Sequence, residues 1–476
     1  MNTFYSIGIG RKFIDTDRTY KVVALKKTYV AMRLLCIISV FLYQNCFSQN
    51  PFITSIYTAD PSAHVWADGR LYVYPSHDID PAKGCDLMDR YHVFSTDDMV
   101  NWRDEGEILN ASQVSWGRKE GGFMWAPDCA YKDGTYYFYF PHPSTTDWNN
   151  DWKIGIATSK QPASNFKPAG YIEGLGGKAM IDPCVFVDTD GKAYFYYGGG
   201  SVCQGGNLKD NMIEIDGEMQ GMRGLVDFHE GTWVFKRNGV YYLTYADNNP
   251  RENQLRYATS SSPLGPWTCR GVYLGPTGCD TNHGSVVEFK GNWYAFYHNK
   301  SLSNTGKGNL RSICVDLLDF NSDGTIRMVQ QTKSGVASVG KKGIIPKKEI
   351  QYEAENATMG GNATIVNDTS ASGGRYVTNL DLGDSYIQFN NITGKRKGGR
   401  ATINIYHSGT SYARIKLSVN GIDYSYLNSL PTGDAGNFKG HTLFTVNLNA
   451  GKNNTIKLIG GNGNINIDYI TVSPID

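Results

Sequence analysis

Charge is scarce in this sequence, and neither sign dominates. Charged residues make up 19% of the 476 positions, and 46 Lys and Arg against 45 Asp and Glu give a formal net charge of +1. Proteins that bind nucleic acid usually carry a basic surface, so we expect no nucleic-acid partner. Aromatic residues are abundant instead, at 13% with 31 Tyr, and such rings stack well on neutral polar ligands such as sugars.

Long hydrophobic runs are also missing. The apolar run at 34–43 is too short to cross a bilayer, and we expect no membrane span. Three basic residues precede this run, and Cys46-Phe47-Ser48 follows it as a small-x-small cleavage site. We therefore expect residues 1–48 to be a signal peptide that starts naturally at Met32, and the protein to be periplasmic or secreted. The bulky and polar residues before Cys46 argue against a lipoprotein anchor.

Cysteine is too sparse and too irregular for a disulfide framework. Of nine Cys, two lie in the expected signal peptide, which leaves an odd number at uneven spacings in the mature chain. This pattern argues against a zinc site as well. A single bridge between Cys269 and Cys279 stays open.

Helical periodicity is almost absent, whereas one hairpin pattern occurs five times. A two-residue turn ending in Gly is followed each time by an aromatic strand such as TYYFYF or VYYLTY. Asp-Gly and Asn-Gly between alternating apolar runs are strong hairpin signals. The turns are Asp68-Gly69, Asp133-Gly134, Asp190-Gly191, Asn238-Gly239 and Lys290-Gly291. Their glycines fall 65, 57, 48 and 52 residues apart, which predicts a five-bladed β-propeller over residues 49–332.

Acidic residues recur in one register of this pattern. Nine residues before each Gly stand Asp60, Trp125, Asp182, Glu230 and Asn282. The innermost strands of a propeller line its axis, so we expect these positions to meet at one mouth of the channel. Each acid alone could be a turn residue, but three acids in one register predict a site for acid–base chemistry.

The sequence changes in character after the expected propeller. Residues 333–349 are rich in Gly and Lys without apolar periodicity, which is typical of a linker. Residues 350–476 carry short alternating runs such as ARIKLSVNG, which predict a β-sandwich of the jelly-roll kind. The expected fold class is therefore all-β, with a propeller followed by a sandwich.

The propeller part resembles glycoside hydrolase family 43. The matching phrases are Thr58-Ala59-Asp60-Pro61, Met124-Trp125-Ala126-Pro127-Asp128, Ile181-Asp182-Pro183, Glu230-Gly231, Asn282-His283-Gly284-Ser285 and Arg311. Members are secreted five-bladed enzymes that remove arabinose and xylose from plant polysaccharides. The resemblance implies an exo-acting, inverting hydrolase that acts as a monomer on arabinoxylan, arabinan or xylan.

The resemblance also implies roles for individual residues. Asp60 would be the general base, Glu230 the general acid, and Asp182 a third acid that raises the pKa of Glu230. Trp125 and Arg311 would contact substrate. Inverting hydrolysis needs such a pair of carboxyl groups, one to activate water and one to protonate the leaving oxygen.

His283 has two interpretations. The resemblance matches it to an axial His that orders a calcium ion or a water at the channel centre. The alternative is a buried His with its hydrogen bonds satisfied, but the register of His283 favours the ion. Calcium prefers oxygen ligands, so a His contact requires water molecules to complete the coordination shell.

The C-terminal part resembles a family 6 carbohydrate-binding module. The matching phrases are Tyr352-Glu353-Ala354-Glu355, Gly383-Asp384-Ser385-Tyr386-Ile387 and Asn466-Ile467-Asp468-Tyr469. The resemblance implies a structural calcium ion held by Glu353, Glu355 and Asp468, although the Glu pair could also be an exposed strand edge. It further implies sugar contacts by Phe438 and Asn466. Asn379 stands where many members have a second aromatic residue.

Three functions remain open from the sequence. The first is an α-L-arabinofuranosidase on arabinoxylan or arabinan side chains. The second is a β-1,4-xylosidase with the same fold and mechanism. The third is a glycan-binding protein without activity, which the intact set of three acids argues against.

Overall fold

The described residues form β-strands and short turns. The computed structural model describes residues 50–474, except for 80–85, 146–150, 176–179, 248, 250–252, 304–305, 307, 341–348, 412, 430 and 439. Within this part, the only helices are three 3-10 turns, at Ala111–Gln113, Ala354–Asn356 and Ser372–Gly374. The all-β prediction is confirmed. No helix among these residues is long and apolar enough to span a membrane. The predicted signal peptide lies outside the described residues.

The first nineteen strands form five antiparallel groups of consecutive strands. The first group is β1 (Ala59–Val65), β2 (Leu71–Ser76), β3 (Arg90–Thr96) and β4 (Trp102–Asn110), and the second is β5 (Asp128–Lys132), β6 (Thr135–Pro143), β7 (Trp152–Ser159) and β8 (Lys167–Tyr171). The third is β9 (Cys184–Val187), β10 (Ala193–Tyr197), β11 (Gln204–Leu208) and β12 (Ile215–Gly221). The fourth is β13 (Glu230–Arg237), β14 (Val240–Ala246), β15 (Leu255–Ser260) and β16 (Thr268–Leu274), and the fifth is β17 (Ser285–Phe289), β18 (Asn292–Asn299) and β19 (Ser312–Leu317).

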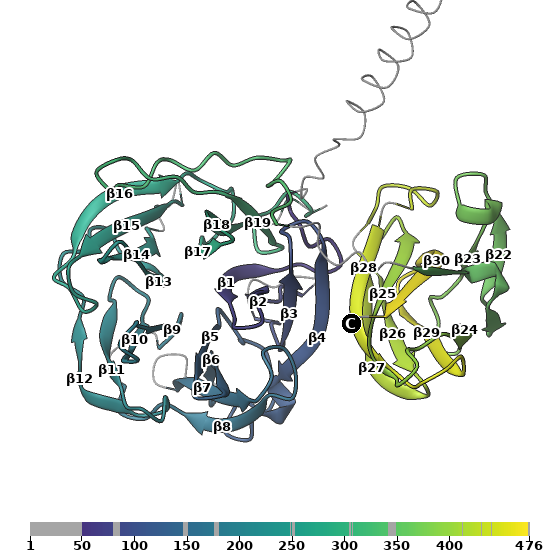
Figure 1. Cartoon of the computed structure of the whole chain (residues 1–476), viewed down its shortest axis with the longest axis horizontal. Coiled ribbons are helices and arrows are strands. Elements are labelled where there is room, and N and C mark those ends of the chain that lie inside the picture. The colour runs from purple at the N-terminus through teal and green to yellow at the C-terminus, as the bar shows by residue number, and fades with distance from the viewer. Residues whose placement is uncertain are drawn as a thin grey trace, which may run out of the picture. The chain divides into compact units, whose positions relative to one another are not determined.

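The first strands of the five groups lie closest to a common centre. Figure 1 shows β1, β5, β9, β13 and β17 on the inside of a ring of sheets. Each of these strands contacts the first strand of the next group, and β17 contacts β1, so the ring is closed. Residues at equivalent positions on these strands therefore come together, as a propeller requires.

The predicted Gly turns join the first and second strands of each group. Asn238 and Gly239 have φ values of 49° and 80°, and Lys290 and Gly291 have 50° and 82°. Positive φ at both positions is the tight hairpin conformation, so a Lys takes the place that usually holds Asn or Asp. All five hairpins form, but the two-residue turn is confirmed only for the second, fourth and fifth groups. In the first and third groups the connection has five residues, and Asp68 and Asp190 have no positive φ.

The Tyr content is explained by the second strands. One Tyr of each second strand is almost completely buried, and its hydroxyl donates a hydrogen bond of 2.6–2.7 Å: Tyr74, Tyr139, Tyr196, Tyr245 and Tyr297. Four of the acceptors are backbone carbonyls, and the fifth is the carboxylate of Asp316. Tyr suits this position because its ring fills the core while its hydroxyl finds a partner.

The N-terminal segment completes the last group. Thr58 donates its backbone N–H to the carbonyl of Arg311, and Phe52 donates to the carbonyl of Ile313. The side chain of Asn50 accepts from the N–H of Val315 and donates to its carbonyl. Residues 50–58 therefore run along β19 and join the two ends of the ring.

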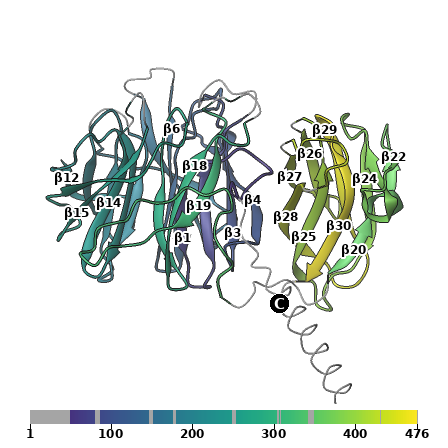
Figure 2. The same ribbon diagram turned by 90° about the horizontal axis from the view of Figure 1, so that it is seen from above.

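The C-terminal strands form two further layers. One layer contains β28 (Gly440–Leu448), β25 (Gly399–Ser408), β30 (Asn466–Pro474), β23 (Arg375–Thr378), β22 (Thr364–Asn367) and β20 (Ile350–Glu353). The other contains β21 (Thr358–Gly360), β24 (Tyr386–Ile392), β29 (Asn454–Asn462), β26 (Ala413–Val419) and β27 (Ile422–Ser429). Figure 2 shows β25, β28 and β30 running alongside β26, β27 and β29. One buried core draws on both layers, including Ile403 and Leu458, and the β-sandwich prediction is confirmed.

Two smaller expectations can also be compared with the structure. The first part of the predicted linker contacts the propeller, since Val336 is buried in its core and Val339 donates to the carbonyl of Asp98. Residues 341–348 lie outside the described part. Cys269 and Cys279 are both free thiols, so the bridge left open by the sequence is not formed.

Candidate active site

The three predicted acids stand where their strands enter the ring. Asp60 lies at the start of β1, Asp182 just before β9, and Glu230 at the start of β13. Asp60 and Asp182 share a left-handed backbone, with φ of 49° and 53°, and Gly231 follows Glu230 with φ of 74°. Asp tolerates this conformation better than most residues. The pairing of β1 with β2 and of β13 with β14 is irregular at these positions, so the acids leave the regular ladder.

Asp60 is buried and ionised. Its Oδ1 accepts a hydrogen bond of 2.8 Å from Nη1 of Arg311, and its Oδ2 accepts one of 2.7 Å from Ser76. Burial opposes ionisation, but the charge of Arg311, with further interactions, outweighs it and lowers the pKa of Asp60 to about 2. This side chain is therefore a carboxylate throughout the neutral pH range.

Arg311 is held by two acids. Besides Asp60, it contacts Asp78 through Nε and Nη2, both at 2.9 Å, and its backbone N–H donates to the same carboxylate at 2.8 Å. Such a bidentate contact fixes the plane of the guanidinium group. The predicted substrate-contacting Arg is thus a buried group whose position is set before any ligand binds.

Asp182 shows the opposite electrostatic behaviour. Its pKa is raised well above 3.8, first by burial and then by the charges of Glu230 and Asp60. Its Oδ2 accepts a hydrogen bond of 2.8 Å from the N–H of Gly231, the residue after Glu230. The three acids therefore interact electrostatically, and Asp182 is tied to the backbone that carries Glu230.

Glu230 is the most accessible of the three acids. Its side chain is 16% exposed, against 7% for Asp182 and 8% for Asp60. His229 lies beside it, with Nδ1 3.7 Å from Oε2 of Glu230. The acid predicted to meet the leaving group is thus the one closest to solvent.

His283 is buried beside the acids. Its Nδ1 lies 3.9 Å from Oδ2 of Asp182, and burial followed by the charge of Arg311 keeps its pKa below the usual value despite Asp60. Among the described residues, no three His, Cys, Asp or Glu side chains lie close enough together to enclose an ion. His283 offers one nitrogen, so these side chains alone do not make a calcium site at the channel centre.

Trp125 belongs to an aromatic cluster that reaches the site. Its ring lies 4.4 Å from that of Trp152 and 6.1 Å from that of Phe123, measured between centroids. The same cluster includes Ile181, which directly precedes Asp182. Trp125, the predicted aromatic substrate contact, therefore belongs to a cluster that extends to the residue before Asp182.

Asp128 is one of three important side chains that the sequence did not reveal. It ends the Trp125-Ala126-Pro127-Asp128 phrase and is almost completely buried. It accepts hydrogen bonds from Ser62 at 2.5 Å and from the N–H of Val185 at 2.6 Å, and His64 lies at 2.7 Å. It therefore links the first, second and third groups of strands.

Asp78 and His298 are the other two. Both are associated with the end of a second strand. Asp78 comes shortly after β2, and His298 lies near the end of β18. The end of a second strand pairs with the start of the first strand, as Ser76 does with Ala59. The ends of the second strands therefore lie at the same mouth of the channel as the three acids, and the sequence pattern could have indicated this.

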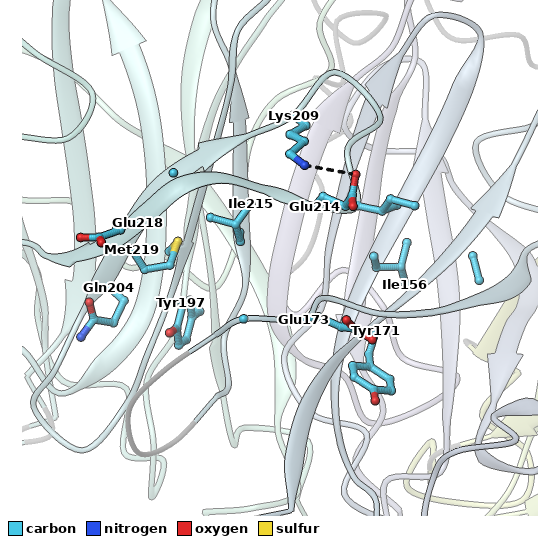
Figure 3. Close-up of a pocket in the computed structure, with 14 residues that line it drawn as sticks. Ile156, Tyr171, Glu173, Tyr197, Gln204, Lys209, Glu214, Ile215, Glu218 and Met219 are labelled. Atoms are coloured by element: carbon cyan, nitrogen blue, oxygen red, sulfur yellow. Dashed lines mark ion pairs between the residues drawn. The ribbon is translucent and has the colours of Figure 1, made fainter.

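A cavity beside these sheets lies outside this cluster. It measures about 900 Å³ and lies between the second and third groups of strands. Figure 3 shows Tyr171, Tyr197, Ile215 and Met219 along it, with Lys209 paired to Glu214 at 3.6 Å. None of the predicted catalytic residues lines it.

Glu353, Glu355 and Asp468 of the module lie close enough together for the charges of the two glutamates to raise the pKa of the aspartate. Burial, opposed by the N–H of Ser372, and the charges of Glu353 and Glu355 raise the pKa of Asp468 to about 6. The Oε2 atoms of Glu353 and Glu355 are buried without a hydrogen-bond partner. Buried carboxylate oxygens without partners are costly, and calcium prefers oxygen ligands, but these three side chains do not lie close enough together to enclose an ion by themselves, so other oxygen ligands would have to complete the shell.

Phe438 and Asn466, the two residues predicted to contact sugar in the module, have different surroundings. Phe438 is half-buried and packs against Tyr376 at 5.2 Å between ring centroids. Asn466 is buried, and its amide group is occupied by Thr378 at 2.6 Å, the carbonyl of Ala435 at 3.1 Å and Ser408 at 3.3 Å. Asn466 therefore holds the Ala435 turn in place, and its amide group is already engaged within the module.

Comparison with known families divides the chain into the same two parts. The model for glycosyl hydrolases family 43 matches residues 48–326, and that for carbohydrate binding module (family 35) matches residues 350–475. The resemblance of the module to family 6 is therefore wrong at the level of the family. Both kinds of module are named for carbohydrate binding, so the expected type of domain is unchanged.

Curated relatives carry two activities in their names. Xylosidase/arabinosidase 43A of Humicola insolens is 36% identical over 336 residues, which cover 58% of this chain and 98% of the relative. Arabinoxylan arabinofuranohydrolase of Bacillus subtilis is 29% identical over 451 residues, which cover 82% of this chain and 84% of the relative.

Solved structures agree with these matches. A β-xylosidase/α-arabinofuranosidase from a compost microbial metagenome is 37% identical with a TM-score of 0.54, and the match covers 59% of this chain and 97% of that one. An arabinoxylan arabinofuranohydrolase from Bacillus subtilis, solved in complex with cellotetraose, is 26% identical with a TM-score of 0.53. That match covers 89% of this chain and 97% of that one.

Proposed function

Because the chain belongs to glycosyl hydrolase family 43, we propose that it releases single pentose units from plant cell-wall polysaccharide by hydrolysis with inversion. The preferred substrate is an α-L-arabinofuranoside side chain of arabinoxylan or arabinan. A β-1,4-xyloside is the second candidate, because relatives of this chain are named for both activities. The five groups of strands are the five blades of the propeller, and the sandwich is a jelly-roll module that binds carbohydrate.

The observation that carries this proposal is the pair of opposite pKa shifts. Asp60 has a pKa of about 2, whereas the pKa of Asp182 is raised well above 3.8 within the same cluster. Acid–base catalysis needs one group kept ionised and one proton retained nearby. Asp60 meets the first need, and the coupled pair Asp182 and Glu230 meets the second.

The proposed reaction follows from these states. Asp60 removes a proton from a water molecule, whose oxygen attacks the anomeric carbon. Glu230 gives its proton to the glycosidic oxygen as the bond between that oxygen and the anomeric carbon breaks. Asp182 and Glu230 repel each other when both are ionised, so the pair keeps one proton, and the Gly231 N–H contact ties Asp182 to the backbone beside Glu230.

Neither calcium ion takes part in this scheme. The module ion is proposed between Glu353, Glu355 and Asp468, where two buried oxygens lack partners. An ion at His283 stays a prediction, as do export of the protein and its monomeric state. No step of the reaction runs through a metal.

The roles can be tested with two variants and two substrates. Asp60→Asn should reduce turnover of both nitrophenyl α-L-arabinofuranoside and nitrophenyl β-D-xyloside to a small residual rate, because no base remains. Glu230→Gln should lose activity on xylo-oligosaccharides by about 10²–10⁴-fold but retain more on the nitrophenyl substrates, whose leaving group needs little protonation.

Controls make the outcome clear. Glu288→Gln, an exposed acid on the inner strand β17, should leave both activities unchanged. Proton NMR of the first product should show the inverted anomer. Full activity of Asp60→Asn, or a product with retained configuration, would overturn the assignment. The ratio of the two nitrophenyl activities decides between arabinofuranosidase and xylosidase.

A further inference from the structure

His298 is a completely buried residue next to Asp60 that the proposed reaction does not use. It lies near the end of β18, 238 positions from Asp60 in the sequence. Its Nδ1 is 3.1 Å from the backbone nitrogen of Asp60, and its Nε2 is 2.8 Å from the carbonyl oxygen of Thr281. Both ring nitrogens therefore have a partner from the backbone.

These two partners define the protonation state of the ring. A carbonyl oxygen only accepts hydrogen bonds, so Nε2 carries the proton and donates it to Thr281. A backbone N–H only donates, so Nδ1 is bare and accepts from Asp60. The neutral form agrees with the direction of the pKa of His298, which burial and the charge of Arg311 lower to about 3.

The hydrogen bond to Nδ1 of His298 is made by the backbone N–H of Asp60, whose conformation is unfavourable by itself. Asp60 has φ of 49°, in the left-handed region that costs free energy for a residue with a side chain. In this conformation its N–H leaves the regular ladder between β1 and β2, whose register shifts between Ala59 and Ser62. The Nδ1 atom of His298 supplies the acceptor that this N–H would otherwise lack in the buried site.

The contact also belongs to a closed circuit of hydrogen bonds. Nη1 of Arg311 donates both to Oγ1 of Thr281 at 2.9 Å and to Oδ1 of Asp60 at 2.8 Å. His298 joins Thr281 back to the N–H of Asp60. The backbone and the carboxylate of Asp60 are thus fixed relative to each other through one buried network.

We propose that His298 is a positioning residue for the reaction, and that its neutral ring with the proton on Nε2 holds Asp60 in its left-handed conformation and so aims the carboxylate at the attacking water. This inference rests on the proposed role of Asp60 as the base. His298 itself does not touch substrate, because its ring is buried behind the backbone of Asp60. A displacement of the base by about 1 Å would be expected to cost roughly a hundredfold in rate.

Two amide variants separate the functions of the two ring nitrogens. In His298→Asn the amide oxygen can occupy the place of Nδ1 and still accept from Asp60. In His298→Gln the amide nitrogen can occupy the place of Nε2, which keeps the Thr281 contact but loses the acceptor. We expect His298→Asn to keep kcat within about threefold, and His298→Gln to lower kcat about 10–100-fold with little change in KM. His92→Gln, at another buried His in β3, is the control that should keep kcat.

Two further measurements complete the test. In the Asp60→Asn background, His298→Gln should lower the residual rate no further, because its effect passes through Asp60. Selective ¹⁵N labelling of His in the unaltered protein should show His298 neutral with a bare Nδ1. Equal kcat for the Asn and Gln variants, a full loss in both backgrounds, or the other tautomer would overturn the proposal. Full activity of Asp60→Asn would instead overturn the proposed role of Asp60, which the single variant shows on its own.

Discussion

At the scale of single residues, two aspartates with the same backbone conformation have opposite pKa shifts. Asp60 and Asp182 both have positive φ and both precede a Pro. Arg311 donates a hydrogen bond to Asp60 at 2.8 Å, whereas the strongest charge acting on Asp182 is that of Glu230, which raises its pKa. The difference therefore arises from neighbours brought in by other strands and not from the local sequence.

The raised pKa of Asp182 has a consequence for stability. The unfolded chain ionises this group near its ordinary value of 3.8, but the folded protein resists ionisation. The stability contribution of Asp182 is therefore complete below about pH 4 and is lost as the pH rises toward the folded pKa. Asp182→Asn removes the ionisation while keeping an acceptor for the Gly231 N–H.

We expect Asp182→Asn to raise the melting temperature by about 2–4 °C at pH 8 and by clearly less at pH 4, which scanning calorimetry can measure. Its kcat should fall, because Glu230 loses the neighbouring carboxyl group with which it shares a proton. Asp190→Asn, an exposed residue in a turn, serves as the control. A larger gain at pH 4 than at pH 8 would contradict the direction of the shift.

The register of the Gly turns was sufficient to find Asp60, Asp182 and Glu230, because it is a local property of each hairpin. It could not find Asp78 or His298. Their importance depends on Arg311 and Asp60, which lie 233 and 238 positions away in the sequence. The module family was also missed, because short alternating strands and a few acidic positions are shared by different families of sandwich.

At the scale of secondary-structure elements, Asp128 connects three strands that are far apart in the sequence. It accepts from Ser62 in β1, lies in β5 and accepts from Val185 in β9. A buried carboxylate with several donors is costly to remove, because each donor is left without a partner. The same carboxylate carries no role in the proposed reaction.

We expect Asp128→Ala to lower the free energy of unfolding by at least about 3 kcal/mol, measured by urea denaturation. The remaining folded protein should keep its KM. Asp210→Ala, whose side chain is fully exposed, should leave the denaturation midpoint unchanged. If Asp128→Ala were as stable as the unaltered protein, the carboxylate would not hold the three strands together.

At the scale of the whole molecule, the calcium ion proposed for the module predicts a stability that depends on Ca²⁺. Adding Ca²⁺ should raise the melting temperature of the module transition, because an ion that binds only the folded state stabilises it by about 2.7 kcal/mol at a hundred times its Kd. Glu355→Gln should abolish this rise, whereas Glu218→Gln, in the exposed part of β12, should not. Identical melting curves in Ca²⁺ and in chelator would refute the proposed ion.

Removal of the module should separate binding from catalysis. A chain ending at residue 349 keeps Asp60, Asp182, Glu230, His283 and Arg311 and should hydrolyse nitrophenyl pentosides at nearly the full rate. Its activity on insoluble arabinoxylan should fall, because the tether no longer raises the local substrate concentration. Loss of activity on the small substrates would instead assign the module a structural role.

The hydrogen bonds between residues 50–58 and β19 can form only late in the synthesis of the chain. Val315, a hydrogen-bond partner of Asn50, is synthesised 265 positions later in the chain. At about 5–20 residues per second on the ribosome, the wait is roughly 13–53 s. During this interval the N-terminal segment has no partner, and the ring cannot close until its last sheet has left the ribosome. Slow codons or a stalled ribosome between β1 and β19 would therefore lengthen the period in which residues 50–58 and the open edge of the ring are without their partner.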